Sequence, residues 1–433
     1  MRTLRVTRRL HAEGWQVTVL TSDPEHFLGS TPNDPALLQQ VPEGVRILRA
    51  GALRPWNAAV ETLKGVSRRG PATGPAAIAP ASQPRRTEGH RSGPMRMLVQ
   101  AKDIVDAALS IPDRELGWLL PALSKGVRDR LHADPPDVIY SSAPPWTGQL
   151  VAAGLKLLLR RPWVADFRDP WARAPWRGDR YRFALRAASA LERRVVRRAD
   201  HIIFVAEGNL EDFAGHYGAS VASKFHLVPN GCDPAEFDAI ERTATSADAP
   251  HVMLHAGSLY GGRTPLPVLQ AVKRALETGR IDRRRFRLRF MGSNAVADLP
   301  GACRQLEIDD VVEFLPRVPR SESLRAMVSA TSLLLLQPGH TVSVPGKVYE
   351  YLAAGRPILA LAEEGETAQV VRRSGIGVSV TPEDETSILD ALLAVVKIAQ
   401  GTVPAPPRDL YDGNAGAATI ERLLRDVVFQ SPS

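Results

Sequence analysis

The feature that most constrains this chain is the alternation of short β-branched and apolar runs with longer stretches of helical periodicity. Such alternation is typical of βαβ units, in which helices join parallel strands and cover both faces of the sheet. Each half of the sequence holds about six runs, which predicts an α/β fold of two Rossmann-like, doubly wound parallel-sheet domains. The expected strands are Gln16–Leu20, Val45–Leu48, Val138–Tyr140, Val164–Phe167, His201–Val205, Phe225–Val228, Val252–His255, Arg287–Phe290, Val311–Phe314, Leu333–Leu336, Ile358–Leu361 and Val378–Val380.

Two domains also follow from the length of 433 residues, since a domain ordinarily takes about 100–200 residues. We expect an N-terminal domain over 1–240 and a C-terminal domain over 250–410, because the intervening polar stretch 238–250 has no strand pattern and ends in proline. Residues 64–94 are rich in Pro, Gly, Ser and Arg and are interpreted as a mobile surface insertion. Residues 411–433 have apolar residues at helical spacing, which predicts a helix that returns toward the first domain.

Composition excludes several classes of protein. The two cysteines, Cys232 and Cys303, are far apart, which argues against a disulfide framework or a zinc site and fits a reducing compartment. No stretch reaches the roughly 18 apolar residues of a membrane span, and the N-terminus lacks the apolar segment of a signal peptide, so we expect a cytoplasmic protein. His255 and His340 are interpreted as packing or hydrogen-bonding residues. No metal site is expected, because metal-ligand spacings are absent, and no cofactor is expected either.

The net charge of +8 is carried almost wholly by arginine. The stretch Lys156–Arg198 holds thirteen Lys or Arg against four acids, and its second part has the pattern of an amphipathic helix. Docking on the inner face of an anionic membrane is one interpretation of this stretch. A solvated arginine face is the alternative and is favoured by the sequence. Nucleic-acid binding is not expected, because no motif supports it.

A candidate phosphate site lies in the sequence PGKVYEYLAAGRPILAL, from Pro345 onward. Pro345 and Gly346 open a predicted helix and Gly355 closes it. The free N–H groups of the helix start carry partial positive charge and Lys347 adds a full one, which suits a diphosphate. Glu350 lies one turn further and is placed to accept hydrogen bonds from ribose hydroxyls. An ordinary surface helix is the alternative.

A second candidate is HAGSLYGGRTP, the first strand-to-helix turn of the second domain and the usual phosphate position in such a sheet. Gly257 and Gly262 let backbone approach an anion, and Arg263 can bind it with two parallel hydrogen bonds. The alternative is a plain turn, because the pattern is not GxGxxG.

The third candidate is ADFRDPW, at the carboxyl end of a strand in the first domain. Ligands of open α/β sheets bind beyond that edge, so Asp169 is a candidate to orient or deprotonate an acceptor hydroxyl. A structural pair between Arg168 and Asp169 is the alternative.

Together with EGWQVTVLTSDP, PDVIYSSAPPWTGQLVA, FVAEGNLEDF and LVPNGCDPAEF, these motifs make nearly the whole chain resemble the family 4 retaining glycosyltransferases of the GT-B fold, also described as group 1. The resemblance implies two Rossmann-like domains facing across a cleft. It also implies transfer of a sugar from a nucleotide-diphosphate donor, with retention of configuration and no obligatory metal.

By position, Glu350 corresponds to the second of the family's paired glutamates and is implied to hold the donor ribose. Arg263 corresponds to one of two basic residues on the diphosphate, and Asp169 lies near the acceptor-side position. With Lys347, which is inferred from its position at a helix start and not from the resemblance, Asp169 and Arg263 are the expected catalytic residues. The expected donor-binding residues are Gly257, Ser258, Gly262, Arg263, Thr341, Ser343, Lys347 and Glu350.

The chain departs from the family pattern in three places. Val342 stands at the first glutamate, which leaves its neighbours Thr341 and Ser343 as candidates for contact with the sugar. Ser258 stands at the first basic position. The glycine-rich loop after the family's first strand is missing, since the chain opens with a helix pattern, and we expect that strand upstream of Met1 rather than lost.

The expected function is a glycosyltransferase that acts on a sugar or lipid-linked acceptor in cell-surface polysaccharide or glycoconjugate synthesis. Two alternatives stay open. One is a non-catalytic or decayed nucleotide-sugar-binding relative, which the substitutions at Ser258 and Val342 favour. The other is a nucleotide-sugar epimerase of the same fold, which needs no acceptor.

Overall fold

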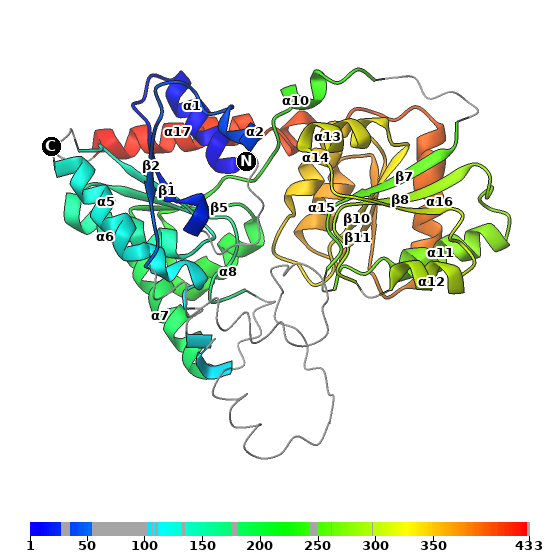
Figure 1. Ribbon diagram of the computed structural model, residues 1–433, viewed down its shortest axis with the longest axis horizontal. Helices are drawn as coiled ribbons and strands as arrows, with labels where there is room; N and C mark the ends of the chain where they lie inside the picture. Colours follow the sequence, from blue (N-terminus) through cyan, green and yellow to red (C-terminus); the bar gives the residue numbers. More distant parts are fainter. Residues whose placement is uncertain are drawn as a thin grey trace, which may run out of the picture. The chain divides into compact units, whose positions relative to one another are not determined.

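The computed structural model describes residues 1–26, 35–53, 103–105, 107–108, 111–131, 135–174, 181–242, 249–260, 262–296 and 298–430. The chain divides into two compact units, shown in Figure 1. Unit 1 comprises Met1–Val228 and Ala417–Ser433, and unit 2 comprises Pro229–Gly416. The expected insertion at 64–94 lies outside the described residues.

The division at Val228 falls earlier in the chain than the polar stretch 238–250 in which we expected it. The reason is packing: Phe237 is buried in the core of unit 2, and Ile240 packs beside it. The residues just after β6 therefore already belong to the second unit.

Strands occupy all twelve positions expected from the sequence, with ends that differ by at most three residues, and every pairing is parallel. The α/β fold of parallel-sheet domains is thereby confirmed. The strands are β1 (Thr18–Ser22), β2 (Arg46–Ala50), β3 (Ile139–Ala143), β4 (Trp163–Phe167), β5 (His201–Phe204), β6 (Phe225–Leu227), β7 (His251–Ala256), β8 (Phe286–Met291), β9 (Val312–Leu315), β10 (Ser332–Leu336), β11 (Ile358–Leu361) and β12 (Gly377–Val380).

Helices connect the strands and cover the sheets. Those wholly in unit 1 are α1 (Arg2–Ala12), η1 (Pro24–His26), α2 (Pro35–Leu38), η2 (Arg114–Trp118), α5 (Leu119–Leu131), α6 (Thr147–Leu159), α7 (Arg182–Arg198), α8 (Glu207–Tyr217) and α9 (Ala219–Ala222). Those of unit 2 are α10 (Ala235–Asp238), α11 (Leu266–Glu277), α12 (Leu299–Gln305), α13 (Arg320–Ser329), α14 (Gly346–Ala354), α15 (Glu366–Arg373), α16 (Glu385–Gln400) and η3 (Arg408–Leu410). The last helix is α17 (Gly413–Gln430).

Unit 1 differs from the expected single sheet, because its strands form a pair, β1-β2, and a separate sheet ordered β3-β4-β5-β6. Val17, just before β1, and Tyr140 of β3 instead pack into one cluster with Val6 and Leu10 of α1. The outer part of α17 completes that cluster through Ala417, Ile420, Leu424 and Val427.

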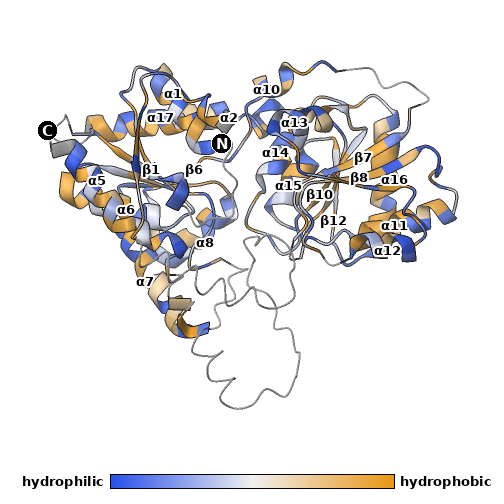
Figure 2. Cartoon of the chain, in the orientation of Figure 1, coloured by the Kyte–Doolittle hydropathy of each residue, from blue (hydrophilic) through white to orange (hydrophobic). Residues whose placement is uncertain are grey.

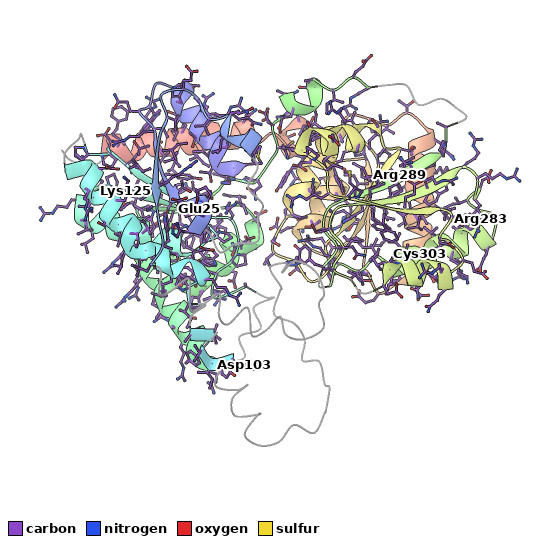
Figure 3. The ribbon with its side chains drawn as sticks, in the orientation of Figure 1. Glu25, Asp103, Lys125, Arg283, Arg289 and Cys303 are labelled. Atoms are coloured by element: carbon purple, nitrogen blue, oxygen red, sulfur yellow. The ribbon has the colours of Figure 1, made fainter. Side chains whose placement is uncertain are left out.

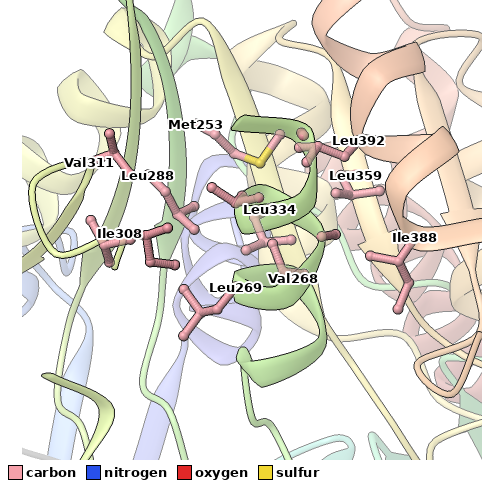
Figure 4. Packing of buried hydrophobic residues seen from close by; sticks show 14 of the residues in the cluster. Met253, Val268, Leu269, Leu288, Ile308, Val311, Leu334, Leu359, Ile388 and Leu392 are labelled. Carbon is pink, nitrogen blue, oxygen red and sulfur yellow. The ribbon is translucent and has the colours of Figure 1, made fainter. Parts of the chain in front are cut away.

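Unit 2 contains one six-stranded sheet in the order β12-β11-β10-β7-β8-β9. Apolar residues fill both faces of this sheet, as expected for parallel strands covered by helices on each side. On one face, Leu334 and Leu359 of the sheet contact Val268 of α11 and Ile388 of α16 (Figure 4). The order reverses between β7 and β10, and in open α/β sheets ligands bind beyond the carboxyl ends of strands at such a switch point.

Both cysteines are buried and neither forms a disulfide within the described residues; Cys232 lies near α14 and Cys303 lies in α12, where Figure 3 labels it. Among the described residues, none of the helices has the length and apolar character needed to span a bilayer. The same residues contain no group of three or more His, Cys, Asp and Glu side chains that could hold a metal ion.

Candidate functional site

A small pocket lies at the switch point of unit 2, where β7 and β10 end and α14 begins. Four of the residues predicted from the sequence line it together, namely Gly257, Ser258, Arg263 and Lys347. The remaining lining residues are His255, Ala256, Leu335, Leu336, Gln337, Pro345 and Tyr351. Two loop-to-helix junctions far apart in the sequence therefore contribute positive charge to one pocket.

The glycine-rich loop after β7 is held closely against its neighbours. The N–H of Gly257 donates to the carbonyl of Met291 at 3.0 Å, and the hydroxyl oxygens of Ser258 and Ser293 lie 2.7 Å apart. A Cβ atom at Gly257 would lie 3.3 Å from Nε2 of His255, so a larger residue would crowd the wall of the pocket. Gly262 also belongs to this loop, and a Cβ atom there would meet only Pro338, at 3.7 Å.

Arg263 is fixed in place by two contacts. Its Nη2 donates to Oε1 of Gln337 at 2.7 Å, and its guanidinium lies over the ring of Tyr260, with Cζ 4.8 Å from the ring centroid. Since Gln337 directly follows β10, this hydrogen bond joins the loops at the ends of the two switch-point strands. The contact holds a long side chain in one orientation before any ligand binds, which lowers the entropic cost of binding an anion.

Lys347 lies in the first turn of α14, and its Nζ forms a 2.7 Å ion pair with Oε2 of Glu350. The other carboxylate oxygen of Glu350, Oε1, accepts a hydrogen bond from Nη1 of Arg320 at 2.6 Å. Arg320 in turn binds Glu236 of α10 through two nitrogens, at 3.1 and 2.7 Å. Burial disfavours the charged form of Glu350, but Lys347 and Arg320 together hold the pKa of its carboxyl below its ordinary value. Glu350 is therefore a carboxylate, and an acceptor of hydrogen bonds.

His255 lies at the wall of the pocket and is uncharged near neutral pH. Burial lowers the pKa of its imidazole to about 4. Nδ1 lies 2.9 Å from the carbonyl oxygen of Leu334, so Nδ1 carries the proton and donates it. Within the described part of the chain, the remaining nitrogen, Nε2, has no hydrogen-bond partner although it is buried.

Thr341 and Ser343 lie on the loop between β10 and α14 but are not among the lining residues of the pocket. The carbonyl of Thr341 accepts from the N–H of Glu366 at 3.0 Å, while its side chain is exposed. Ser343 is buried, and its carbonyl accepts from the hydroxyl of Thr367 at 3.0 Å. The loop that carries them is thus anchored on α15.

Comparison with known proteins matches both parts of the chain to glycosyltransferase families. Residues 81–236 match Glycosyltransferase Family 4, and residues 250–397 match Glycosyl transferases group 1. The two matches together support a GT4-like glycosyltransferase. The second match contains the whole switch-point pocket.

Solved structures similar to this GT4-like glycosyltransferase confirm the GT-B fold. Anabaena Alr3699/HepE in complex with UDP matches with a TM-score of 0.51 at 18% identity, over 78% of this chain and 87% of that one. WaaG, a glycosyltransferase involved in lipopolysaccharide biosynthesis, matches with a TM-score of 0.53 at 14% identity, over 99% and 93%. The sucrose-phosphate synthase of Thermosynechococcus elongatus matches with a TM-score of 0.58 at 16% identity, over 98% and 90%.

A curated relative, the probable glycosyltransferase WbjE of Pseudomonas aeruginosa, is 25% identical over 134 residues. That match spans 29% of this GT4-like chain and 32% of the length of the relative.

Asp169 stands apart from the other predicted residues of the GT4-like protein, since it belongs to unit 1 and they belong to unit 2. It follows β4, and burial raises the pKa of its carboxyl despite the opposing charge of Arg168. The guanidinium of Arg168 donates instead to the carbonyls of Ala143 and Pro144, and so fixes the loop after β3. A carboxylate with a raised pKa is a stronger base, which suits contact with a hydroxyl.

The sequence did not predict three residues of the GT4-like site, which are Gln337, Tyr351 and Arg320. In the sequence, Gln337 has the position of a residue at the end of an apolar strand, and Tyr351 that of a residue on one face of a helix. In the structure, the hydroxyl of Tyr351 joins β7 to β10, because it accepts from the N–H of Ala256 and donates to the carbonyl of Leu334. Arg320 is separated from Glu350 by 30 positions, so no local pattern links them. His255, in contrast, is interpreted from the sequence as a packing or hydrogen-bonding residue, and its bond to the carbonyl of Leu334 confirms this.

Proposed function

We propose that the chain transfers a sugar, with retention of configuration, from a nucleotide-diphosphate donor to the hydroxyl of a sugar or lipid-linked acceptor. The observation that carries this proposal is the convergence of Arg263, Lys347 and the Gly257 backbone on one pocket at a switch point. A diphosphate is the ligand class that two cationic side chains and a glycine-rich strand-to-helix turn suit. The UDP present in the similar HepE structure supports the same ligand class.

Each of the site residues of unit 2 has a different role toward the donor. Arg263 and Lys347 stabilise the negative charge that grows on the diphosphate as the bond to the sugar breaks, which is ordinarily the largest contribution to catalysis. Glu350, held ionised by Lys347 and Arg320, accepts hydrogen bonds from the donor ribose. The exposed side chain of Thr341 is assigned to the sugar, and Ser343 supports its loop.

On the acceptor side, Asp169 of unit 1 orients the attacking hydroxyl and accepts its proton. The hydroxyl attacks from the face that the diphosphate leaves, because no strong protein nucleophile lies among the residues of the pocket. We propose no metal and no further cofactor. We place the reaction in the cytoplasm, at the inner face of the membrane for a lipid-linked acceptor, in polysaccharide or glycoconjugate synthesis.

The first experiment screens nucleotide diphosphates and their sugars by thermal shift, since a bound ligand raises the apparent stability by mass action. The donor that binds is then incubated with candidate acceptors and the product is analysed. Arg263→Ala and Lys347→Ala are each expected to lower kcat by about 10²-fold. Arg274→Ala, at an exposed arginine of α11 outside the pocket, is the matched control. Unchanged turnover in both pocket variants would remove the mechanism.

A second candidate function is binding of a nucleotide sugar without transfer. It is favoured by Ser258, which stands where the family has a basic residue and whose hydroxyl bonds to Ser293. Donor binding with no product for any acceptor would support this function. Conversion of the donor alone would indicate an epimerase.

A further inference from the structure

The imidazole of His255 is a polar group near the end of an apolar strand. Residues 252–254, which precede it in β7, are all apolar, and Figure 2 shows hydrophobic residues along β7 and β10. The side chain of His255 is buried and lines the same pocket as Arg263 and Lys347. The proposed transfer reaction gives it no role.

One ring nitrogen of His255 is held by the protein, and the other faces the glycine-rich loop. Nδ1 donates to the carbonyl of Leu334 on β10, at 2.9 Å, which fixes the orientation of the ring. Nε2 is the ring atom nearest to the position of a Cβ atom on Gly257, at 3.3 Å, against 3.7 Å for Cε1. Within the described ranges of the chain, Nε2 is buried and has no hydrogen-bond partner. Because buried polar atoms are almost always hydrogen-bonded, this nitrogen is placed to bond a group of the ligand.

Among the described residues, the charged groups that most affect His255 are both positive. Burial is the main cause that lowers the pKa of the imidazole to about 4, and Arg263 on the loop after β7 and Lys347 in the first turn of α14 lower it further. β8 contributes the uncharged ring of Phe290, whose centroid is 6.0 Å from that of the imidazole. α14 also contributes the hydroxyl of Tyr351, which is neutral because burial raises its pKa. In the free chain, Nε2 therefore carries a lone pair and no hydrogen near neutral pH.

The protein offsets only part of this positive charge. Lys347 is paired with Glu350, but Glu350 is shared with Arg320. Arg263 binds the neutral side-chain amide of Gln337, so its guanidinium keeps its full charge there. A diphosphate bound beside these cations would bring several negative charges to the wall of the pocket, and would reverse the sign of the potential that the imidazole experiences.

We propose that His255 takes up a proton from solvent at Nε2 when the diphosphate binds, and that this N–H donates a hydrogen bond to a phosphoryl oxygen. Phosphoryl oxygens accept hydrogen bonds and donate none, so a neutral Nε2 would meet them lone pair to lone pair. A protonated Nε2 forms a charge-assisted hydrogen bond instead. The inference rests on the proposed diphosphate site and adds a third cation to it.

Such a bond makes donor binding depend on pH. The pKa of His255 is about 4 in the free chain and is raised in the complex, so the complex holds a proton that the free chain does not. The affinity for the nucleotide therefore rises as the pH falls toward the pKa of the complex, by at most about tenfold per pH unit. An imidazole that stays neutral in the complex gives no dependence of this kind.

The test is isothermal titration of UDP, and in parallel of GDP, into the full chain between about pH 8 and about pH 6. Two buffers of different ionisation enthalpy at each pH give the number of protons taken up on binding. Relative to His255→Gln, the wild-type chain should gain at least about threefold in affinity at the acid end and take up more protons. Glutamine offers an amide N–H and does not titrate, and ionisation of the nucleotide is common to both proteins and cancels in the comparison.

The matched control is His251→Gln. His251 lies on the same strand and burial also lowers its pKa to about 4, but its Nε2 is 2.8 Å from the hydroxyl of Ser332 and it is not among the lining residues of the pocket. This variant should keep the pH dependence of the wild-type chain. A second variant, His255→Phe, keeps an aromatic ring without a hydrogen bond, and should bind the nucleotide about tenfold more weakly and with the pH dependence of His255→Gln.

Two results would overturn this inference alone. One is nucleotide binding in which the wild-type chain and His255→Gln take up equal numbers of protons. The other is loss of the pH dependence in His251→Gln as well, which would attribute it to the fold rather than to the pocket. Absence of binding of both UDP and GDP by the wild-type chain is a different result, because it would overturn the proposed diphosphate site and the inference with it.

Discussion

Nη1 of Arg320 lies 2.6 Å from Oε1 of Glu350, and the same guanidinium binds Glu236 on its other edge. The carboxylate assigned to the donor ribose is therefore held from two sides, by Arg320 and by Lys347, whose Nζ is 2.7 Å away. Because Glu350 is mostly buried, each partner restricts where its oxygens can point. Arg320 is a positioning residue in this arrangement.

Replacing Arg320 by Gln should weaken nucleotide binding about five- to tenfold while Lys347 keeps Glu350 ionised. The loss of charged hydrogen bonds should also lower the free energy of unfolding by about 1–3 kcal/mol. Nucleotide titration and urea unfolding measure the two effects. Arg320→Lys keeps a cation and should restore part of the binding. Reduced stability with unaltered nucleotide affinity would limit Arg320 to a structural role.

Glu350 should make stability depend on pH in the acid range. Its folded-state pKa lies below the ordinary value of 4.5, so its contribution is present above pH 4.5 and is lost as pH falls through the lower folded value. The difference in unfolding free energy between wild type and Glu350→Gln should thus be largest near neutral pH and shrink below pH 4.5. Urea unfolding at a series of pH values tests this. A difference that stays constant would show that Glu350 is not held as a carboxylate.

The sequence indicates the strands of this fold well, because a parallel strand that is buried on both faces is rich in apolar residues, as Leu333–Leu336 of the fully buried β10 are. It indicates the boundary between the units poorly, since burial of Phe237 is decided by a core assembled from distant segments. The same limit applies to the site. Arg263 and Lys347 stand at helix starts, which local patterns reveal, whereas the pairing of Arg320 with Glu350 exists only once α13 and α14 pack together.

His255 should lower the free energy of unfolding as the solution becomes acidic. Burial lowers its folded pKa from 6.5 to about 4, so between these values the unfolded chain takes up a proton that the folded chain does not. The free energy of unfolding should therefore decrease as the pH is lowered through that window, by up to about 1.4 kcal/mol per pH unit. His255→Phe should remove this part of the slope. Tyr351 still donates to the carbonyl of Leu334, at 3.2 Å, so the substitution leaves that acceptor satisfied. Identical slopes in the two proteins would contradict a neutral, buried imidazole.

Gly292 should be required for the shape of the glycine-rich loop. Its φ is +147°, and a Cβ atom there would lie 2.4 Å from the carbonyl oxygen of Gly257, which the backbone cannot accept without moving. Gly292→Ala should thus displace the Gly257 backbone and lower nucleotide affinity at least about tenfold, since preorganised groups bind an anion only where they already point.

Gly279→Ala is the matched control, because Gly279 also has a positive φ, +66°, but a Cβ atom there meets nothing within 4 Å. This control should lose stability by about 1 kcal/mol from backbone strain and keep its nucleotide affinity. Isothermal titration with the nucleotide that the donor screen identifies measures both variants. Equal affinities in the two would mean that the carbonyl at Gly257 moves freely, and that the loop after β7 does not hold the diphosphate.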